Sequence, residues 1–140
     1  MIGKIDHVGI AVKDTEAALR FYRDVLGIRV AHSEAVPSDG VRITFLPVGE
    51  SQIEFVEPLS EASPAAKFIE RRGEGIHHIC LEVDDIEATL KEMERQGLTL
   101  IDRAPRKGGH GKLVVFVHPN STSGVLIELA QSTHEAHSTS

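Results

Sequence analysis

The stretch GIHHICLEV, residues 75–83, repeats a pattern that the chain carries once before, in KIDHVGIAV at residues 4–12. The two stretches align at an offset of 71 residues, and the similarity continues into the segments that follow them. A long period with only two copies excludes a solenoid, which needs more repeats to bury its core. It indicates a duplicated supersecondary unit, and each copy places a histidine, His7 or His78, at the same point of its first strand.

Composition and charge narrow the class of protein. With 140 residues, 41% of them hydrophobic and 26% charged, the chain has the size and balance of one globular domain. The net charge of −6 argues against nucleic acid or an anionic membrane as a partner. Cys80 is the only cysteine, which excludes an internal disulfide and favours a reducing compartment. No apolar run approaches the ~20 residues of a membrane span, and no signal peptide is visible, so we expect a cytoplasmic protein.

Hydrophobic periodicity predicts how each copy begins. Alternation over residues 5–12 predicts a strand with one apolar face, which suits packing under a helix. The other face carries His7 between small residues. A helix is expected next, over residues 15–26, with Asp14 or Thr15 as its N-cap.

Turn-forming residues separate the remaining elements. A short helix is predicted to begin at Ser63-Pro64 and to end at Gly73. The other predicted elements are strands at residues 28–35, 41–48, 51–57, 76–83, 98–104, 112–118 and 124–131, and a helix at 85–96.

These elements predict an α+β fold, a single domain over residues 1–140 with two tandem βαβββ modules. Module one covers residues 4–58 and module two covers 76–131, with a joining segment at 59–75. The polar tail, residues 132–140, is expected to be disordered.

A second pair of matched polar residues lies in the last strand of each module. Glu54 is flanked by apolar residues, as is Glu128. Because successive side chains of a strand point to opposite faces, both carboxylates should leave the helix-packed face, the face that His7 and His78 also avoid. If the two sheets curl and join into one curved mixed sheet, these four side chains converge.

Two imidazoles and two carboxylates suit one divalent ion such as cobalt, zinc, nickel or manganese, with positions left for water or substrate. A single histidine or glutamate in a strand is more often part of an ordinary hydrogen bond or ion pair. The same residue types at matched positions in both copies favour a metal site formed by His7, Glu54, His78 and Glu128. The alignment pairs His78, rather than its neighbour His77, with His7.

Paired βαβββ modules with this order of histidines and glutamates resemble the vicinal oxygen chelate superfamily, also called the glyoxalase/bleomycin resistance/dioxygenase superfamily. The resemblance spans residues 4–131. Within the superfamily, residues 57–78 and 118–129 are similar to methylmalonyl-CoA epimerases. Glyoxalase I would instead carry an Asn-Trp segment after the first glutamate, and this chain contains no tryptophan.

The resemblance implies a metal-dependent isomerase that interconverts the 2R and 2S forms of methylmalonyl-CoA, an acyl-CoA thioester, through a metal-stabilised enolate. It also implies a homodimer. One of Glu54 and Glu128 would remove the α-proton and the other would return a proton to the opposite face. Some epimerases carry glutamine at the position of Glu54 and an acid on the neighbouring strand, near Ile43. Here Ile43 supplies no carboxylate and Glu54 is the acid, so the resemblance leaves open which glutamate is the metal ligand and which is the base.

Three other functions remain open from the sequence. Glyoxalase I shares the metal and a glutamate base but acts on a glutathione hemithioacetal. A non-catalytic small-molecule binding protein of the same fold would lack the four ligands. A dioxygenase would favour two histidines and one glutamate on iron. For the phosphates of coenzyme A, the basic residues beside a glycine-rich loop are candidates, although a solvated loop explains them equally well: Arg103, Arg106, Lys107 and Lys112.

Overall fold

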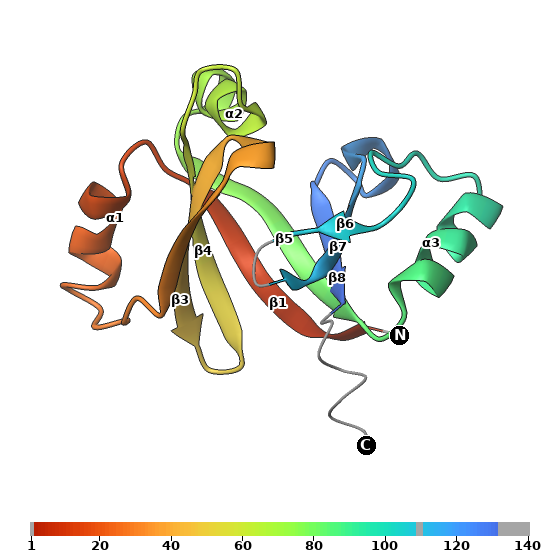
Figure 1. Cartoon of the computed structure of the whole chain (residues 1–140), viewed down its shortest axis with the longest axis horizontal. Coiled ribbons are helices and arrows are strands. Elements are labelled where there is room, and N and C mark those ends of the chain that lie inside the picture. The colour runs from red at the N-terminus through yellow and green to blue at the C-terminus, as the bar shows by residue number, and fades with distance from the viewer. Residues whose placement is uncertain (1, 109–110, 132–140) are drawn as a thin grey trace. The chain divides into compact units, whose positions relative to one another are not determined.

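The computed structural model describes residues 2–108 and 111–131, and Figure 1 shows its course. Eight strands and three α-helices lie within these ranges. The chain divides into two compact units. The first unit consists of residues 7–77, and the second consists of the described parts of residues 1–6 and 78–140. Strands β1 (Ile2–Ala11) and β5 (Gly75–Val83) each supply residues to both units.

The first unit packs a helix on a four-stranded layer. Its strands lie in the order β2-β3-β4-β1, with β1 parallel to β4 and the other pairs antiparallel. Helix α1 covers one face, beside β3 and β4 in Figure 1, where Val12, Leu19, Leu46 and Phe55 form the core. The other elements are α1 (Thr15–Tyr22), β2 (His32–Val36), η1 (Pro37–Asp39), β3 (Val41–Val48), β4 (Ser51–Pro58) and α2 (Pro64–Arg72).

The second unit repeats this arrangement. Its strands lie in the order β5-β8-β7-β6, with β5 parallel to β8. Helix α3 covers the face on which Val83, Ile86, Leu90, Val115 and Leu129 pack. The elements are α3 (Ile86–Arg95), β6 (Arg106–Lys107), β7 (Leu113–Val117), η3 (Pro119–Ser121) and β8 (Ile127–Gln131).

The βαβββ order of both copies, and with it the predicted α+β fold, is confirmed. The helices begin where their capping residues predict. Asp14, and not Thr15, caps α1 by accepting hydrogen bonds from the amides of Glu16 and Ala17. Ser63 caps α2, which ends at Gly73. In the described ranges no helix combines the length and apolar character needed to cross a membrane.

The predicted strand over residues 98–104 is wrong. Only Leu100 forms an isolated bridge, to Val117, and the edge strand of the second unit is the short β6, which lies within residues 105–111, predicted as a glycine-rich loop. A side chain explains the difference, because the Asp102 carboxylate accepts a hydrogen bond from the Phe116 amide at 2.8 Å and replaces a strand carbonyl there.

The end of the first helix and the start of the strand that follows it also differ from the prediction. The first helix, predicted through residue 26, ends at Tyr22 in a series of turns closed at Gly27, and β2 begins only at His32. The predicted tail, residues 132–140, and Gly109-His110 of the glycine-rich loop lie outside the described residues.

Phe55 gives a test of the first unit's core. Its ring is fully buried against α1, whereas Phe21 of α1 is 52% exposed. Replacing Phe55 by Ala should lower the free energy of unfolding by about 3–5 kcal/mol, since the change leaves a cavity. Phe21→Ala, the matched control, should change it by less than about 1 kcal/mol. Urea unfolding followed by circular dichroism measures both, and equal losses would contradict this account of the core.

Candidate metal centre

In the first unit, His7 of β1 lies beside Glu54 of β4. Gly9 is the register partner of Glu54 in the parallel pair of strands, so His7, two residues earlier on β1, shares its face. Ile53 and Phe55 point the other way and pack against the α1 side. His7 Nδ1 lies 2.9 Å from Glu54 Oε2.

In the second unit, His78 of β5 lies beside Glu128 of β8 in the same way. Cys80 is the register partner of Glu128, and His78 again precedes it by two residues. Ile127 and Leu129 pack on the α3 side. His78 Nε2 lies 3.1 Å from Glu128 Oε1. Alternation along the strands therefore produces the same histidine–glutamate pair in each unit.

All four side chains are buried. The exposed fractions of the residues are 5% for His7, 6% for Glu54, 5% for His78 and 8% for Glu128. A buried carboxylate costs several kcal/mol of free energy unless a partner compensates its charge. A neutral imidazole donates one hydrogen bond but supplies no positive charge, so each pair calls for a proton or a cation.

The two neighbouring histidines of β5 have different surroundings. His77 packs edge-on against Phe68 of α2, with ring centroids 4.9 Å apart. His78 lies beside Glu128 and also contacts the Phe116 ring, at 5.7 Å. The residue that the repeat pairs with His7 is thus the one beside the buried carboxylate.

An aromatic residue belongs to each pair, and the sequence reasoning missed it. Phe45 of β3 is the register partner of Glu54, and Phe116 of β7 is the register partner of Glu128. Both rings lie on the face of the carboxylate, because cross-strand partners point to the same side. The offset of 71 residues between Phe45 and Phe116, the same as between the histidines, was a signal that could have found them.

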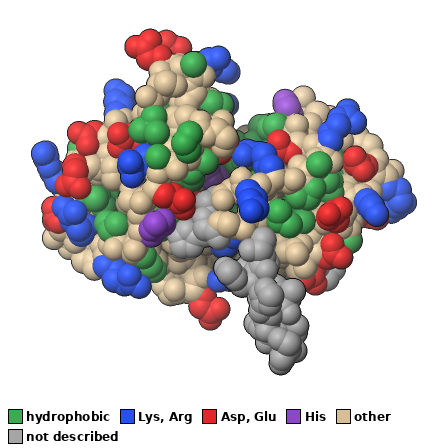
Figure 2. Space-filling model, in the orientation of Figure 1, with side chains coloured by type: hydrophobic (Ala, Val, Ile, Leu, Met, Phe, Trp, Pro, Cys, Tyr) green, Lys and Arg blue, Asp and Glu red, His purple; other side chains and the backbone are tan. Residues whose placement is uncertain are grey.

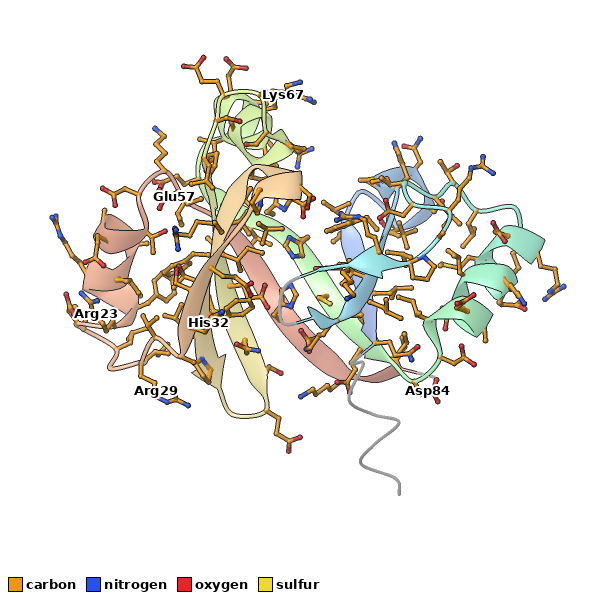
Figure 3. The ribbon with its side chains drawn as sticks, in the orientation of Figure 1. Arg23, Arg29, His32, Glu57, Lys67 and Asp84 are labelled. Atoms are coloured by element: carbon orange, nitrogen blue, oxygen red, sulfur yellow. The ribbon has the colours of Figure 1, made fainter. Side chains whose placement is uncertain are left out.

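Two further side chains at matched positions, one in each unit, link the strand that carries the glutamate to the helix of that unit. Glu57, three residues after Glu54, accepts a hydrogen bond from the Thr15 amide at 2.9 Å, and its side chain lies near the start of α1 in Figure 3. Gln131, three residues after Glu128, accepts one from the Ile86 amide at 2.7 Å. These side chains satisfy helix amides that have no partner within the helix.

Asp6, the residue before His7, is another buried carboxylate that the sequence did not single out. It is 3% exposed and forms an ion pair with Lys112, whose side chain is 20% exposed. Both residues belong to the second unit. The pair fastens the end of the glycine-rich loop to β1.

The donor atoms of each pair fit a metal ion. Nitrogen and oxygen ligands bind divalent ions such as zinc at about 2.0–2.2 Å, so two ligands at right angles lie about 3 Å apart. The pairs at 2.9 and 3.1 Å have this spacing. A direct hydrogen bond between imidazole and carboxylate has the same length, which makes metal binding the measurement that separates the two interpretations.

Comparison with known proteins gives the following relations. Residues 6–116 match the family described as the glyoxalase/bleomycin resistance protein/dioxygenase superfamily. The chain is 43% identical to the ethylmalonyl-CoA/methylmalonyl-CoA epimerase of Cereibacter sphaeroides, over 94% of this chain and 99% of that protein. It is 38% identical to the human mitochondrial methylmalonyl-CoA epimerase, over 94% of this chain and 75% of that protein.

Solved structures show the same relation. A variant of the Streptomyces coelicolor methylmalonyl-CoA epimerase in complex with 2-nitronate-propionyl-CoA superimposes with a TM-score of 0.91 at 34% identity, covering 95% of this chain and 96% of that chain. A methylmalonyl-CoA epimerase in complex with methylmalonyl-CoA and NH4+ gives the same values. A probable lactoylglutathione lyase of Synechocystis is 30% identical, over 91% of this chain and 94% of that protein.

Metal titration tests the two pairs. We expect the metal-free protein to bind one divalent ion per chain, and His78→Gln to weaken binding by more than about tenfold, because it removes a donor atom. Isothermal titration with Co²⁺ or Zn²⁺ measures the affinity. His77→Gln, one residue away and packed on Phe68, is the matched control and should bind like the unchanged protein. Equal affinity of the two variants would contradict the assignment of His78.

Proposed function

Because the chain belongs to the methylmalonyl-CoA epimerase family of isomerases, within the glyoxalase/bleomycin resistance protein/dioxygenase superfamily, we propose that it interconverts the 2R and 2S forms of methylmalonyl-CoA. One structural observation carries the proposal: a buried histidine–glutamate pair occurs at the same register position of both units. Duplicated acid–base and metal-binding groups suit an enzyme that must treat both faces of one carbon.

The metal site in this proposal comprises His7, Glu54, His78 and Glu128. Two imidazoles supply nitrogen donors and two glutamate side chains supply oxygen donors, a set that suits one divalent cation. When bound, the cation supplies a Lewis acid that stabilises negative charge on the thioester oxygen as the α-proton leaves. Cobalt, zinc, nickel and manganese all accept this donor set.

Glu54 and Glu128 also move the proton. Each carboxylate has two oxygens, and those that approach the histidines are Oε2 of Glu54 and Oε1 of Glu128. The second oxygen of one glutamate takes the α-proton, and the second oxygen of the other, already protonated, returns a proton to the opposite face of the carbon. For the other epimer the two roles exchange. No atom is gained or lost apart from the exchanged proton.

Glu54 serves both as a metal ligand and as an acid–base group, because the neighbouring strand, β3, offers no acidic side chain. Ile43 of β3 is paired with Val56 of β4, on the same face as Glu54. Ile43 packs there against the buried apolar cluster of Val41, Val56 and Ala65. A charged side chain at position 43 would have to enter this apolar cluster at a considerable cost in free energy.

The wider context is proposed on the same basis. We propose that residues 1–140 form a single domain, which is built from two modules at residues 4–58 and 76–131. The protein is proposed to work as a homodimer in the cytoplasm, on an acyl-CoA thioester and without nucleic acid. Acidic and basic side chains are interspersed over the face shown in Figure 2, where no continuous basic surface gathers.

Glyoxalase I is the second candidate, since it would use the same metal and a glutamate base. The epimerase relatives are more similar to this chain, at 38–43% identity against 30% for the probable lactoylglutathione lyase. We expect the protein to catalyse exchange of the α-proton of methylmalonyl-CoA with solvent deuterium, and to form no lactoylglutathione from the methylglyoxal–glutathione hemithioacetal. Mass spectrometry of the thioester and absorbance of lactoylglutathione measure the two reactions. The opposite pattern would favour glyoxalase I.

Substitution of the glutamates tests their role. Glu54→Gln and Glu128→Gln should each lower the epimerisation rate by about 10²- to 10⁴-fold, because the amide can neither accept nor return the proton. The fold should persist, since glutamine has nearly the same shape. Deuterium incorporation into methylmalonyl-CoA measures the rate, and circular dichroism checks the fold.

Glu57→Gln is the matched control for these variants. It lies on the same strand as Glu54 and caps α1 through the Thr15 amide, an interaction that a glutamine oxygen preserves. We expect its rate to stay within about twofold of the unchanged enzyme. Full activity of Glu128→Gln would refute the assignment of that residue as acid or base.

A further inference from the structure

In each unit a row of side chains crosses the sheet from the glutamate to the edge strand, where it ends at a histidine or an arginine. In the first unit the register places His32 of β2 opposite Phe45, which is opposite Glu54. The His32 ring stacks on Phe45, with centroids 5.7 Å apart and planes 24° from parallel. His32 is labelled in Figure 3.

The second unit carries a similar row that ends at an arginine, although this arginine is not directly opposite the aromatic ring. Arg106 of β6 is the register partner of Val114, two residues before Phe116 on β7, which puts it on the same face as Glu128. Its guanidinium carbon lies 5.5 Å from the centroid of the Phe116 ring, a cation–π contact. That ring also contacts His78. Arg106, Phe116 and Glu128 therefore form one continuous strip.

Asp102 orients the arginine. One of its oxygens accepts the Phe116 amide hydrogen bond at 2.8 Å, and the other lies 3.6 Å from Arg106 Nε. The aromatic ring below and the carboxylate beside it hold the guanidinium in place, while the side chain stays 37% exposed. Two fixed supports and an accessible charge are what recognition of an anion requires.

We propose that Arg106 positions the substrate by binding an oxyanion of the thioester, either the free carboxylate of the acyl group or a phosphate of coenzyme A. The inference rests on the proposed function. Adjacent strands lie about 4.8 Å apart, so the backbones of β6 and β8 are about 10 Å apart, and an arginine can reach either group from there. In the first unit the aromatic ring stacks on a histidine, His32, rather than on an arginine, so the proposed contact belongs to the second unit.

A structural role is the alternative. A charged residue on the inward face of an edge strand can serve only to prevent pairing with another sheet, and Arg106 could do no more than neutralise Asp102. Neither role affects the affinity for a thioester. Ligand binding therefore separates these explanations from the proposal.

Isothermal titration with racemic methylmalonyl-CoA and with methylmalonyl-pantetheine, which lacks the phosphates, provides the test. Arg106→Met should weaken methylmalonyl-CoA binding by about tenfold, the usual effect of losing a hydrogen bond to a charged group. Arg106→Lys, which keeps the charge and guards against misfolding of the Met variant, should give an intermediate loss. Arg95→Met is the matched control, because Arg95 is an exposed arginine of the same unit paired with Glu92 on α3.

The two ligands identify the oxyanion. An equal loss for both assigns the acyl carboxylate, and a loss for methylmalonyl-CoA alone assigns a phosphate. Both results support the proposal. Affinities of the folded Arg106→Met protein within twofold of the unchanged protein for both ligands would overturn it. If the unchanged protein binds methylmalonyl-CoA but does not epimerise it, the proposed function fails while the binding difference still tests Arg106.

Discussion

A buried carboxylate next to a histidine, present once in each unit, is the constraint on which the rest of the structure depends. Glu54 and Glu128 are both less than 10% exposed, and a charge removed from water at such a position costs several kcal/mol. This cost arises once in each unit. It follows from the alternation of side chains along β4 and β8: the apolar neighbours of each glutamate pack toward a helix, so the carboxylate points to the other face of the sheet. We propose one divalent cation as the compensation for both pairs.

The two units carry the same residue types at some equivalent positions and different residue types at others. The histidine, the glutamate and the aromatic ring opposite the glutamate are retained in both units. The helix-capping residue differs, Glu57 in the first unit and Gln131 in the second, and the aromatic ring contacts His32 in the first unit and Arg106 in the second. An epimerase needs equivalent acid–base groups for the two faces of one carbon, but its substrate has only one coenzyme A arm. Under the proposals above, the retained carboxylates serve the two faces of the carbon, and Arg106, in one unit, binds an oxyanion of the substrate.

The fold was predictable because its signals are local and repeated. Helix caps such as Asp14 and Ser63, and the alternation of strand residues, depend on neighbours within a few positions. The strand predicted over residues 98–104 failed because one of its own side chains competes with its backbone: the Asp102 carboxylate, in place of a strand carbonyl, accepts the hydrogen bond of the Phe116 amide. No local pattern reveals that competition.

The two histidine–glutamate pairs were predictable only as far as the repeat could be aligned. His7, His78, Glu54 and Glu128 were singled out because both copies keep the residue type. Phe45 and Phe116 escaped notice because a phenylalanine in a strand is normally a core residue, and only the register shows that these two share the face of the glutamates. The ion pair of Asp6 and Lys112 joins positions far apart in the sequence, so it required coordinates.

A crystal structure of the cobalt-loaded protein, with the ion located by its anomalous scattering, tests the central claim most directly. The account predicts one ion per chain with His7, Glu54, His78 and Glu128 as its protein ligands, at about 2.0–2.3 Å. An ion held by other side chains, or by the histidine–glutamate pair of one unit alone, would contradict it.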